Sequence, residues 1–122
     1  MKLNVNPDIP EPGPMVFDSR SPQVAHGGLT QEFVGQTIEV KRPVFNSGIV
    51  TLMDFRCDQS KGVHFIYILP FSSTNALVES TRISETLCPQ KFYKEEIKTY
   101  LSQKLDCSEY RIISEEYGKI PM

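Results

Sequence analysis

The sequence predicts an α+β fold, with one antiparallel sheet of about five strands and one main amphipathic helix. Residues 31–84 contain short segments rich in Val, Ile, Phe and Tyr that alternate with turn residues, which is typical of consecutive strands. After Pro89 the apolar residues recur at helical spacing as far as Leu105. A chain of 122 residues, 39% hydrophobic and 23% charged, suits one domain with a modest core.

The first three predicted strands follow one another in the middle of the chain. The segment QEFVGQTIEVKRPV, residues 31–44, contains Gly35, which indicates a bulge or the close approach of another segment. GIVTLMDFR, residues 48–56, is the next strand, and the turn after it contains Gly62, where we expect a positive φ. VHFIYILPF, residues 63–71, is apolar on both faces, as in a central strand.

The second half of the chain completes the sheet and adds the helix. ALVESTRIS, residues 76–84, is predicted as the fourth strand, and SEYRIISEEYG, residues 108–118, as the last. Pro89 suits the first position of a helix because proline lacks a backbone N–H. One face of this helix is apolar, so the helix should pack on the sheet. The residues of that face are Tyr93, Ile97, Tyr100, Leu101 and Leu105.

The N-terminal residues have a different composition. Four of the first fourteen residues are proline, which predicts an extended arm over residues 1–14 and a single domain over residues 15–122. MVFD, residues 15–18, is predicted as a short strand. The sequence has no apolar run of signal-peptide or membrane-spanning length. We therefore expect an intracellular protein, cytoplasmic or peripherally associated with a membrane, and not a secreted one.

Several classes of site are disfavoured by the sequence. Cys57, Cys88 and Cys107 form an odd set without CxxC spacing, which predicts reduced thiols. His26 and His64 have no neighbouring ligands, so no metal site is expected. Neither GxGxxG nor GxxxxGK[ST] occurs, so the chain shows no nucleotide site of its own. A net charge of −2 and the absence of a basic patch argue against a nucleic-acid partner.

Asp54 and Arg56 are two residues apart on a predicted strand, so their side chains share one face. Two interpretations stay open for them. They form an ordinary ion pair at the margin of the sheet, or they supply the polar lining of a substrate pocket.

Glu79 is the candidate catalytic residue. Because side chains alternate along a strand, Glu79 shares a face with Leu77 and Ile83, and the prediction is that this face is interior. A buried carboxyl has a raised pKa, which is how proteins make a general acid. Two alternatives remain: a cross-strand partner such as Arg56, or simple exposure on an edge strand.

The order of several motifs resembles one known family. FDSR, QEFVG, MDFRCDQ, FIYILPFS, ALVEST and GKIPM occur here in one run between residues 16 and 122. This run is similar to the middle of the flavin-dependent lycopene cyclases of carotenoid biosynthesis. Those enzymes are intramolecular lyases, a class of isomerase, that close the acyclic ends of lycopene into ionone rings.

The resemblance implies a fold and a set of partners. Family members resemble flavin monooxygenases, in which a dinucleotide-binding part carries FAD and a separate antiparallel sheet holds the substrate. This chain would be the substrate-side portion of such a flavoenzyme and inactive alone. The complete enzyme would use reduced FAD with NAD(P)H, and we expect no cofactor on this chain. Its partners would be a lipophilic carotenoid and the missing flavin-binding part, and any membrane contact would be peripheral.

The resemblance also implies residue roles. The acid of LVEST is Glu79, which would protonate a terminal C=C bond before ring closure. Phe65, Tyr67 and Phe71 would supply aromatic walls for the cation, with ordinary core packing as the alternative for each ring. Gln36 replaces the aromatic residue that usually follows the QxFxG motif, which predicts a substrate site of different shape.

Two other functions remain open. One is the substrate domain of a related flavin monooxygenase, which would leave the acid of LVEST unexplained. The other is a module without catalysis that binds a lipophilic ligand or a partner chain.

Overall fold

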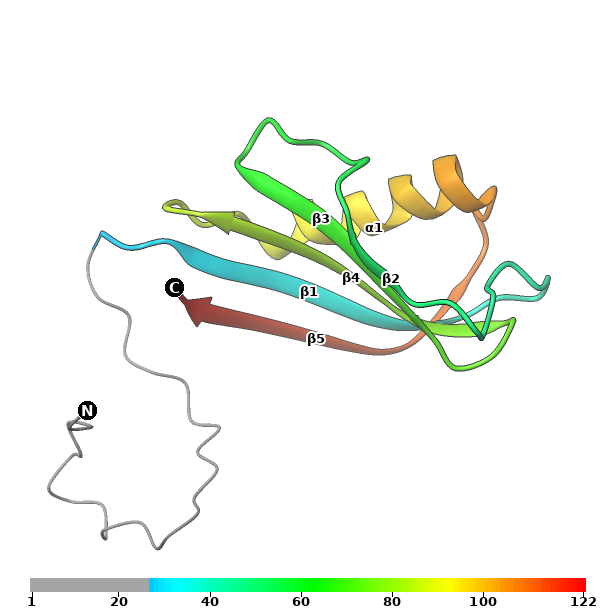
Figure 1. Ribbon diagram of the computed structural model, residues 1–122. Helices are drawn as coiled ribbons and strands as arrows, with labels where there is room; N and C mark the ends of the chain where they lie inside the picture. Colours follow the sequence, from blue (N-terminus) through cyan, green and yellow to red (C-terminus); the bar gives the residue numbers. More distant parts are fainter. Residues whose placement is uncertain (1–26) are drawn as a thin grey trace, which may run out of the picture.

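The computed structural model describes residues 27–122 and confirms the α+β fold. Five antiparallel strands form one sheet in the order β2-β3-β4-β1-β5, with the helix on one side (Figure 1). The elements are β1 (Thr30–Glu39), β2 (Thr51–Asp54), β3 (Val63–Pro70), β4 (Asn75–Ser84), α1 (Gln90–Leu105) and β5 (Arg111–Pro121). The predicted arm over residues 1–14, the short strand over residues 15–18, and His26 lie outside the described residues.

Helix α1 covers one face of the sheet and contacts β4 and β1. It buries Tyr93, Ile97, Tyr100 and Leu101, four of the five apolar residues predicted from the helical spacing. Leu105 is partly buried against the same core. The helix ends where Asp106 adopts a left-handed conformation, φ 49°, and the backbone N–H of Cys107 donates to the Leu101 carbonyl at 3.0 Å.

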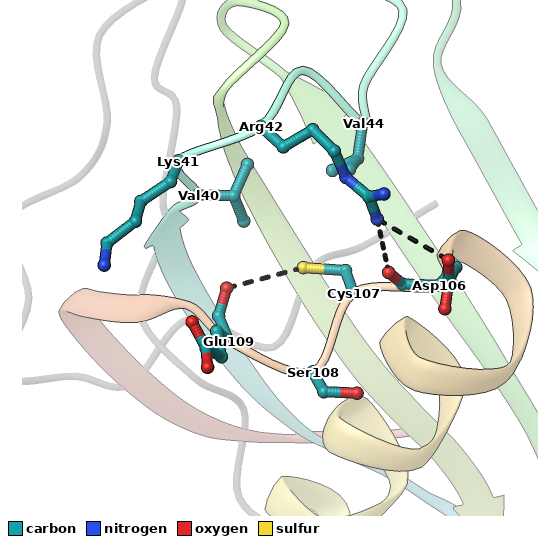
Figure 2. A pocket seen from close by; sticks show the side chains of 8 residues that line it. All are labelled: Val40, Lys41, Arg42, Val44, Asp106, Cys107, Ser108 and Glu109. Carbon is teal, nitrogen blue, oxygen red and sulfur yellow. Dashed lines mark hydrogen bonds and ion pairs between the residues drawn. The ribbon is translucent and has the colours of Figure 1, made fainter.

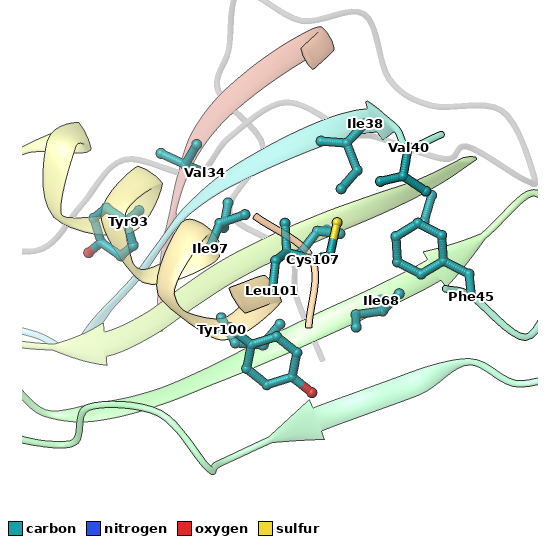
Figure 3. Packing of buried hydrophobic residues seen from close by; sticks show 13 residues of the cluster. Val34, Ile38, Val40, Phe45, Ile68, Tyr93, Ile97, Tyr100, Leu101 and Cys107 are labelled. Carbon is teal, nitrogen blue, oxygen red and sulfur yellow. The ribbon is translucent and has the colours of Figure 1, made fainter. Parts of the chain in front are cut away.

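The hydrophobic core lies between this helix and the sheet (Figure 3). Burying these apolar side chains away from water is the main force that holds α1 on the strands. The strands contribute alternate residues, as the two-residue period of a strand requires. They are Val34 and Ile38 of β1, Ile66 and Ile68 of β3, and Ala76 and Val78 of β4.

The other face of the sheet, called the open face here, has no helix packed on it among residues 27–122. Strand register places on it the alternate residues of the three central strands. These are Phe33, Gly35 and Thr37 of β1, Phe65, Tyr67 and Leu69 of β3, and Leu77, Glu79, Thr81 and Ile83 of β4. Most of these side chains are apolar.

The prediction that Leu77 and Ile83 line the interior is wrong. The helix covers the opposite face of β4, where Val78, Ser80 and Arg82 are buried, Arg82 to 2% exposure. Leu77, Glu79 and Ile83 are only half-buried. Both faces of this strand carry apolar residues, and the position of the helix decides which one becomes the core.

Strand β2 is shorter than predicted. Only residues 51–54 pair with β3, although the sequence pattern runs over residues 48–56. Met53 has a left-handed backbone, φ 53°, and the register shifts between Thr51 and Asp54. A left-handed residue interrupts the extended ladder, so the pairing cannot continue regularly. The expected positive φ in the next turn is confirmed, with Gly62 at φ 115°.

Candidate functional site

Glu79 lies in the middle of β4, a central strand, and not at an edge of the sheet. Its partners in register are Tyr67 of β3 on one side and Gly35 of β1 on the other. The hydroxyl of Thr81 donates a hydrogen bond to Oε1 of Glu79 at 2.7 Å. Burial raises the pKa of the Glu79 carboxyl, and the negative charge of Glu116 raises it further. The hydrogen bond from Thr81 lowers it by less than these two effects raise it. The net pKa lies above its ordinary value, as the chemistry of a proton donor requires.

Two of the three predicted aromatic residues lie beside Glu79. Tyr67 is directly opposite it, and Phe65 packs edge-on against Tyr67 with 5.2 Å between ring centroids. Phe65 is buried and also meets Phe55 at 5.6 Å. Phe71 lies past the end of β3, where it is 64% exposed. The structure therefore brings Tyr67 and Phe65 to the candidate acid and places Phe71 in the turn that follows.

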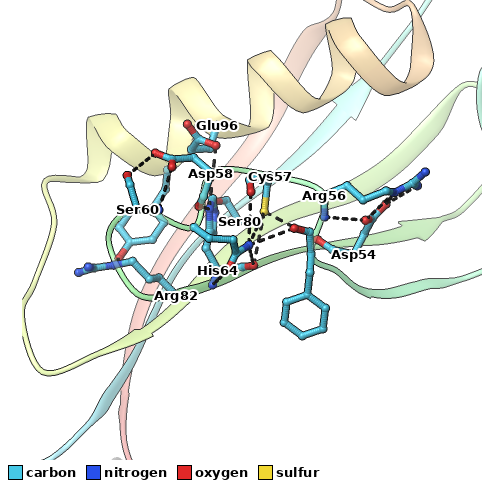
Figure 4. Close-up of polar contacts among 12 residues, drawn as sticks. Asp54, Arg56, Cys57, Asp58, Ser60, His64, Ser80, Arg82 and Glu96 are labelled. Carbon is cyan, nitrogen blue, oxygen red and sulfur yellow. Dashed lines mark hydrogen bonds and ion pairs between the residues drawn. The ribbon is translucent and has the colours of Figure 1, made fainter.

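Asp54 and Arg56 form a bidentate ion pair (Figure 4). Nη2 of Arg56 lies 2.6 Å from Oδ2 of Asp54, and Nε lies 2.9 Å from Oδ1. The Tyr100 hydroxyl of α1 donates to the same Oδ2 at 2.6 Å, which places the pair on the helix side of the sheet. The hydrogen bonds from Arg56 hold the pKa of the Asp54 carboxyl well below its usual range. Arg56 also lines a cavity of about 280 Å³ beside α1. Neither Asp54 nor Arg56 shares a face with Glu79. Arg56 is therefore not the cross-strand partner of Glu79 that the sequence suggested.

A buried polar network on the helix side was not predicted from the sequence. Glu32 is 2% exposed and accepts hydrogen bonds from the hydroxyls of Tyr93 and Tyr117, both at 2.7 Å, and from the backbone N–H of Cys88 at 3.0 Å. The guanidinium of Arg82 lies 3.8 Å away. Arg82 is itself buried and donates to Tyr93 at 3.2 Å. The alternation of β1 and β4 places both residues on the core face, which is the only sequence signal for this pair.

The Glu32 carboxyl is stabilised in its charged form. Burial raises its pKa, but the hydrogen bonds from Cys88, Tyr93 and Tyr117 outweigh that effect, so the net pKa is lowered. These bonds connect β1 to α1 and to the edge strand β5. The network therefore joins three elements around one buried charge.

His64 has a structural role. It is fully buried, with Nδ1 2.8 Å from the Asp58 carbonyl and Nε2 2.7 Å from the Ser80 hydroxyl (Figure 4). Because a carbonyl only accepts hydrogen bonds, Nδ1 carries a hydrogen and donates it to Asp58. Residues 27–122 contain no group of three or more potential metal ligands.

The three cysteines are free thiols in the structure. Burial, with the nearby charge of Glu96, raises the pKa of Cys57 to about 11. Burial likewise raises the pKa of Cys107. Such thiols are poor nucleophiles at neutral pH, since the thiolate is the reactive form.

Gln36 lies on the helix-covered face and is 2% exposed. Its Nε2 donates to Glu115 at 2.7 Å, while its Oε1 is buried and has no hydrogen-bond partner among the described residues. Glu115 also meets Lys94 of α1 at 2.5 Å. The side chain of Gln36 points to the face opposite Glu79, and the expectation that it changes the shape of the substrate site stays a prediction.

A second cavity, of about 250 Å³, lies where the end of β1 meets the connection between α1 and β5 (Figure 2). Arg42 donates to the Asp106 carbonyl across it at 2.6 Å. None of the predicted site residues lines this cavity. Its lining residues are Val40, Lys41, Arg42, Val44, Asp106, Cys107, Ser108 and Glu109.

The lowered pKa values of Glu32 and Asp54 predict that the chain loses stability in acid. A carboxyl whose folded pKa is depressed stabilises the fold above its unfolded pKa, and this contribution disappears as pH falls through the folded value. Urea unfolding should therefore show a declining midpoint as pH falls below about 5. The Glu32→Gln and Asp54→Asn double variant should have a weaker pH dependence. If the urea midpoint of the double variant declines as steeply with falling pH as that of the wild type, Glu32 and Asp54 are not the source of the acid sensitivity.

The fold and the position of Glu79 define an α+β domain that presents a carboxyl on the open side of an antiparallel sheet. The chain belongs to the lycopene cyclase family, because the family model described as lycopene cyclase protein matches residues 6–122. Over 57 residues it is 46% identical to the lycopene beta-cyclase of Paracoccus sp. (strain N81106 / MBIC 01143). That match covers 45% of this chain and 14% of the relative. No solved structure matches the chain.

The described residues do not fit the FAD that the family resemblance implies. A dinucleotide pyrophosphate usually binds a glycine-rich turn between a strand and the start of a helix. The turn that leads into α1 contains Glu85, Leu87 and Cys88 but no glycine, and the Cys88 N–H already donates to Glu32. No chemical step is therefore assigned to a flavin on this part of the chain. In the same part, no helix is long and apolar enough to span a membrane.

Proposed function

We propose that this sheet is the substrate side of a lycopene cyclase and that Glu79 is its proton donor. The observation that carries the proposal is a half-buried carboxyl at the centre of an apolar, open sheet face. Family membership supports a carotenoid substrate, which is a long hydrocarbon that needs an apolar surface. The match of Glu79 to the acid of the family motif LVEST supports its role.

The proposed reaction is an isomerisation in which all atoms are conserved. The carboxyl proton of Glu79 adds to a terminal C=C bond and leaves a carbocation. The neighbouring C=C bond attacks this cation and closes the ring, and the new cation then loses a proton from an adjacent carbon. Tyr67 is the register partner of Glu79 and Phe65 packs against Tyr67, which supports a role for these two rings in stabilising the positive charge. The raised pKa of Glu79 favours the protonated form that the first step consumes.

The remaining components are assigned outside the described residues. Reduced FAD, with NAD(P)H as its reductant, would be held by a flavin-binding part that covers the open face. The open face would then become the wall of a closed cavity, which would exclude water from the carbocation. Peripheral contact with a membrane would give such an enzyme access to its lipophilic substrate.

A chimera tests the proposed function. Residues 6–122 of this chain replace the equivalent region of the Paracoccus lycopene beta-cyclase, and the protein is produced in cells that accumulate lycopene. Chromatography with mass spectrometry should show a cyclised product of unchanged mass. Addition of oxygen to the product would support the monooxygenase alternative instead. A folded chimera that retains lycopene without converting it would support the module without catalysis.

A further inference from the structure

A second carboxylate lies in the same cross-strand row as Glu79. Gly35 of β1 is the register partner of Glu79 on one side and of Glu116 of β5 on the other. Residues directly opposite one another in a sheet point to the same face, so both carboxyl groups are on the open face. The row therefore runs from Tyr67 through Glu79 and Gly35 to Glu116.

Gly35 leaves the space between the two acids free. A methyl group at this position would lie 3.1 Å from Oε1 of Glu116 and 3.3 Å from Cδ1 of Leu77. The carboxylate of Glu116 thus extends over the bare backbone of Gly35 towards β4. Two strand spacings separate the backbones of Glu79 and Glu116 by roughly 10 Å, and this side chain shortens the gap. Of the two features predicted at Gly35, a bulge or the close approach of another segment, the structure shows the close approach.

The charge of Glu116 is not compensated near Glu79 by any described residue. Thr81 and Glu116 are the groups that act on the Glu79 carboxyl, and Tyr67 faces it from β3. Lys119 of β5 is the register partner of Glu32, so it points to the helix-covered face. The two acids of β5 therefore differ: Glu115 is bound by Lys94 and Gln36 on the helix side, and Glu116 faces Glu79.

We infer that Glu116 is the charge partner of Glu79, and that its carboxylate keeps the proton on Glu79 at a pH at which Glu79 alone would release it. The catalytic meaning of the pair rests on the proposed function. Once Glu79 has given its proton to the substrate, both carboxylates are negative and face the carbocation, which stabilises it. The proton released after ring closure returns to the pair and restores the protein.

Titration of the full 122-residue chain tests this pairing directly. Carbon-13 NMR follows the side-chain carboxyl of Glu79, which the Glu79→Gln variant identifies. The Glu116→Gln variant should shift the Glu79 midpoint to lower pH. The matched control Glu115→Gln removes a charge from the same strand but on the other face, and should leave the midpoint unchanged. Equal Glu79 midpoints in the wild type and Glu116→Gln would overturn the inference.

Ionic strength separates a charge effect from a structural one. High salt screens charges across an open face, so it should lower the Glu79 midpoint of the wild type and reduce its difference from Glu116→Gln. A difference that high salt leaves unchanged would mean that the substitution alters the structure around Glu79, which would overturn the inference.

The same variants in the chimera distinguish the pairing from the proposed function. If Glu79 is the acid, ring formation declines as pH rises through its midpoint, and Glu116→Gln should move that decline to lower pH. If Glu116→Gln shifts the Glu79 titration but leaves the pH profile of ring formation unchanged, Glu116 is the charge partner of Glu79, and Glu79 is not the acid. If Glu116→Gln leaves the Glu79 midpoint unchanged, Glu116 is not the charge partner of Glu79, regardless of ring formation by the chimera.

Discussion

Glu79→Gln is expected to reduce ring formation by the chimera about 10²–10⁴-fold, the usual value of a general acid. Glutamine has nearly the same shape but no ionisable proton, so the terminal C=C bond would have no donor. The product is measured by chromatography of carotenoids after a fixed time, normalised to the amount of folded protein.

Two controls accompany this measurement. Glu115→Gln removes a carboxylate on the helix side of β5 and should leave the rate within a few-fold of the wild type, because it lies on the other face from Glu79. The Glu79→Gln protein should unfold at nearly the same urea concentration as the wild type, since Glu79 is only half-buried. A near-normal rate of ring formation in Glu79→Gln would place the acid elsewhere.

Arg82→Met is expected to destabilise the chain by about 3–5 kcal/mol, the usual cost of leaving a buried charge without its partner. Arg82 is 2% exposed, and its loss removes the cation from Glu32 and one donor from the Tyr93 hydroxyl. It also frees the carbonyls of Lys61 and Thr86, which the guanidinium holds. The free energy of unfolding is measured by urea denaturation at pH 7.

An exposed arginine in the same sheet provides the matched control. Arg111 pairs with Glu39 at 2.9 Å, but its side chain is 69% exposed. Arg111→Met should therefore cost about 0–1 kcal/mol, the typical value of a surface ion pair. Combining Arg82→Met with Glu32→Leu should recover part of the loss, because neither charge then remains buried alone. Equal destabilisation by the two single arginine substitutions would contradict the buried network.

The secondary structure was largely predictable because each element has its own local signal. The five apolar residues of the predicted helix identify its packed face, and Pro89 marks its start within one residue. The short β2 was not predictable, because nothing in the sequence signals the left-handed backbone of Met53. A residue of that type usually avoids such a conformation.

The site was only partly predictable, because its geometry depends on which face the helix covers. Alternation along β4 placed Glu79 with Leu77 and Ile83, and that grouping is correct. Since both faces of the strand carry apolar residues, alternation alone could not show that the helix packs on Val78 and Arg82 instead. The Glu32 network and the Glu79–Glu116 row join residues that are distant in sequence. Contacts of that kind follow from sheet register, which a single sequence does not specify.

The deuterium content of rings formed in D₂O tests most directly whether Glu79 is the acid. If Glu79 delivers an exchangeable proton to carbon, the wild-type chimera should add one deuterium per ring, because the proton lost after closure comes from carbon. Mass spectrometry should then show a product one mass unit heavier per ring, and Glu79→Gln should give almost none of it. Rings without deuterium, or labelled rings formed at the wild-type rate by Glu79→Gln, would contradict the proposal that Glu79 is the acid.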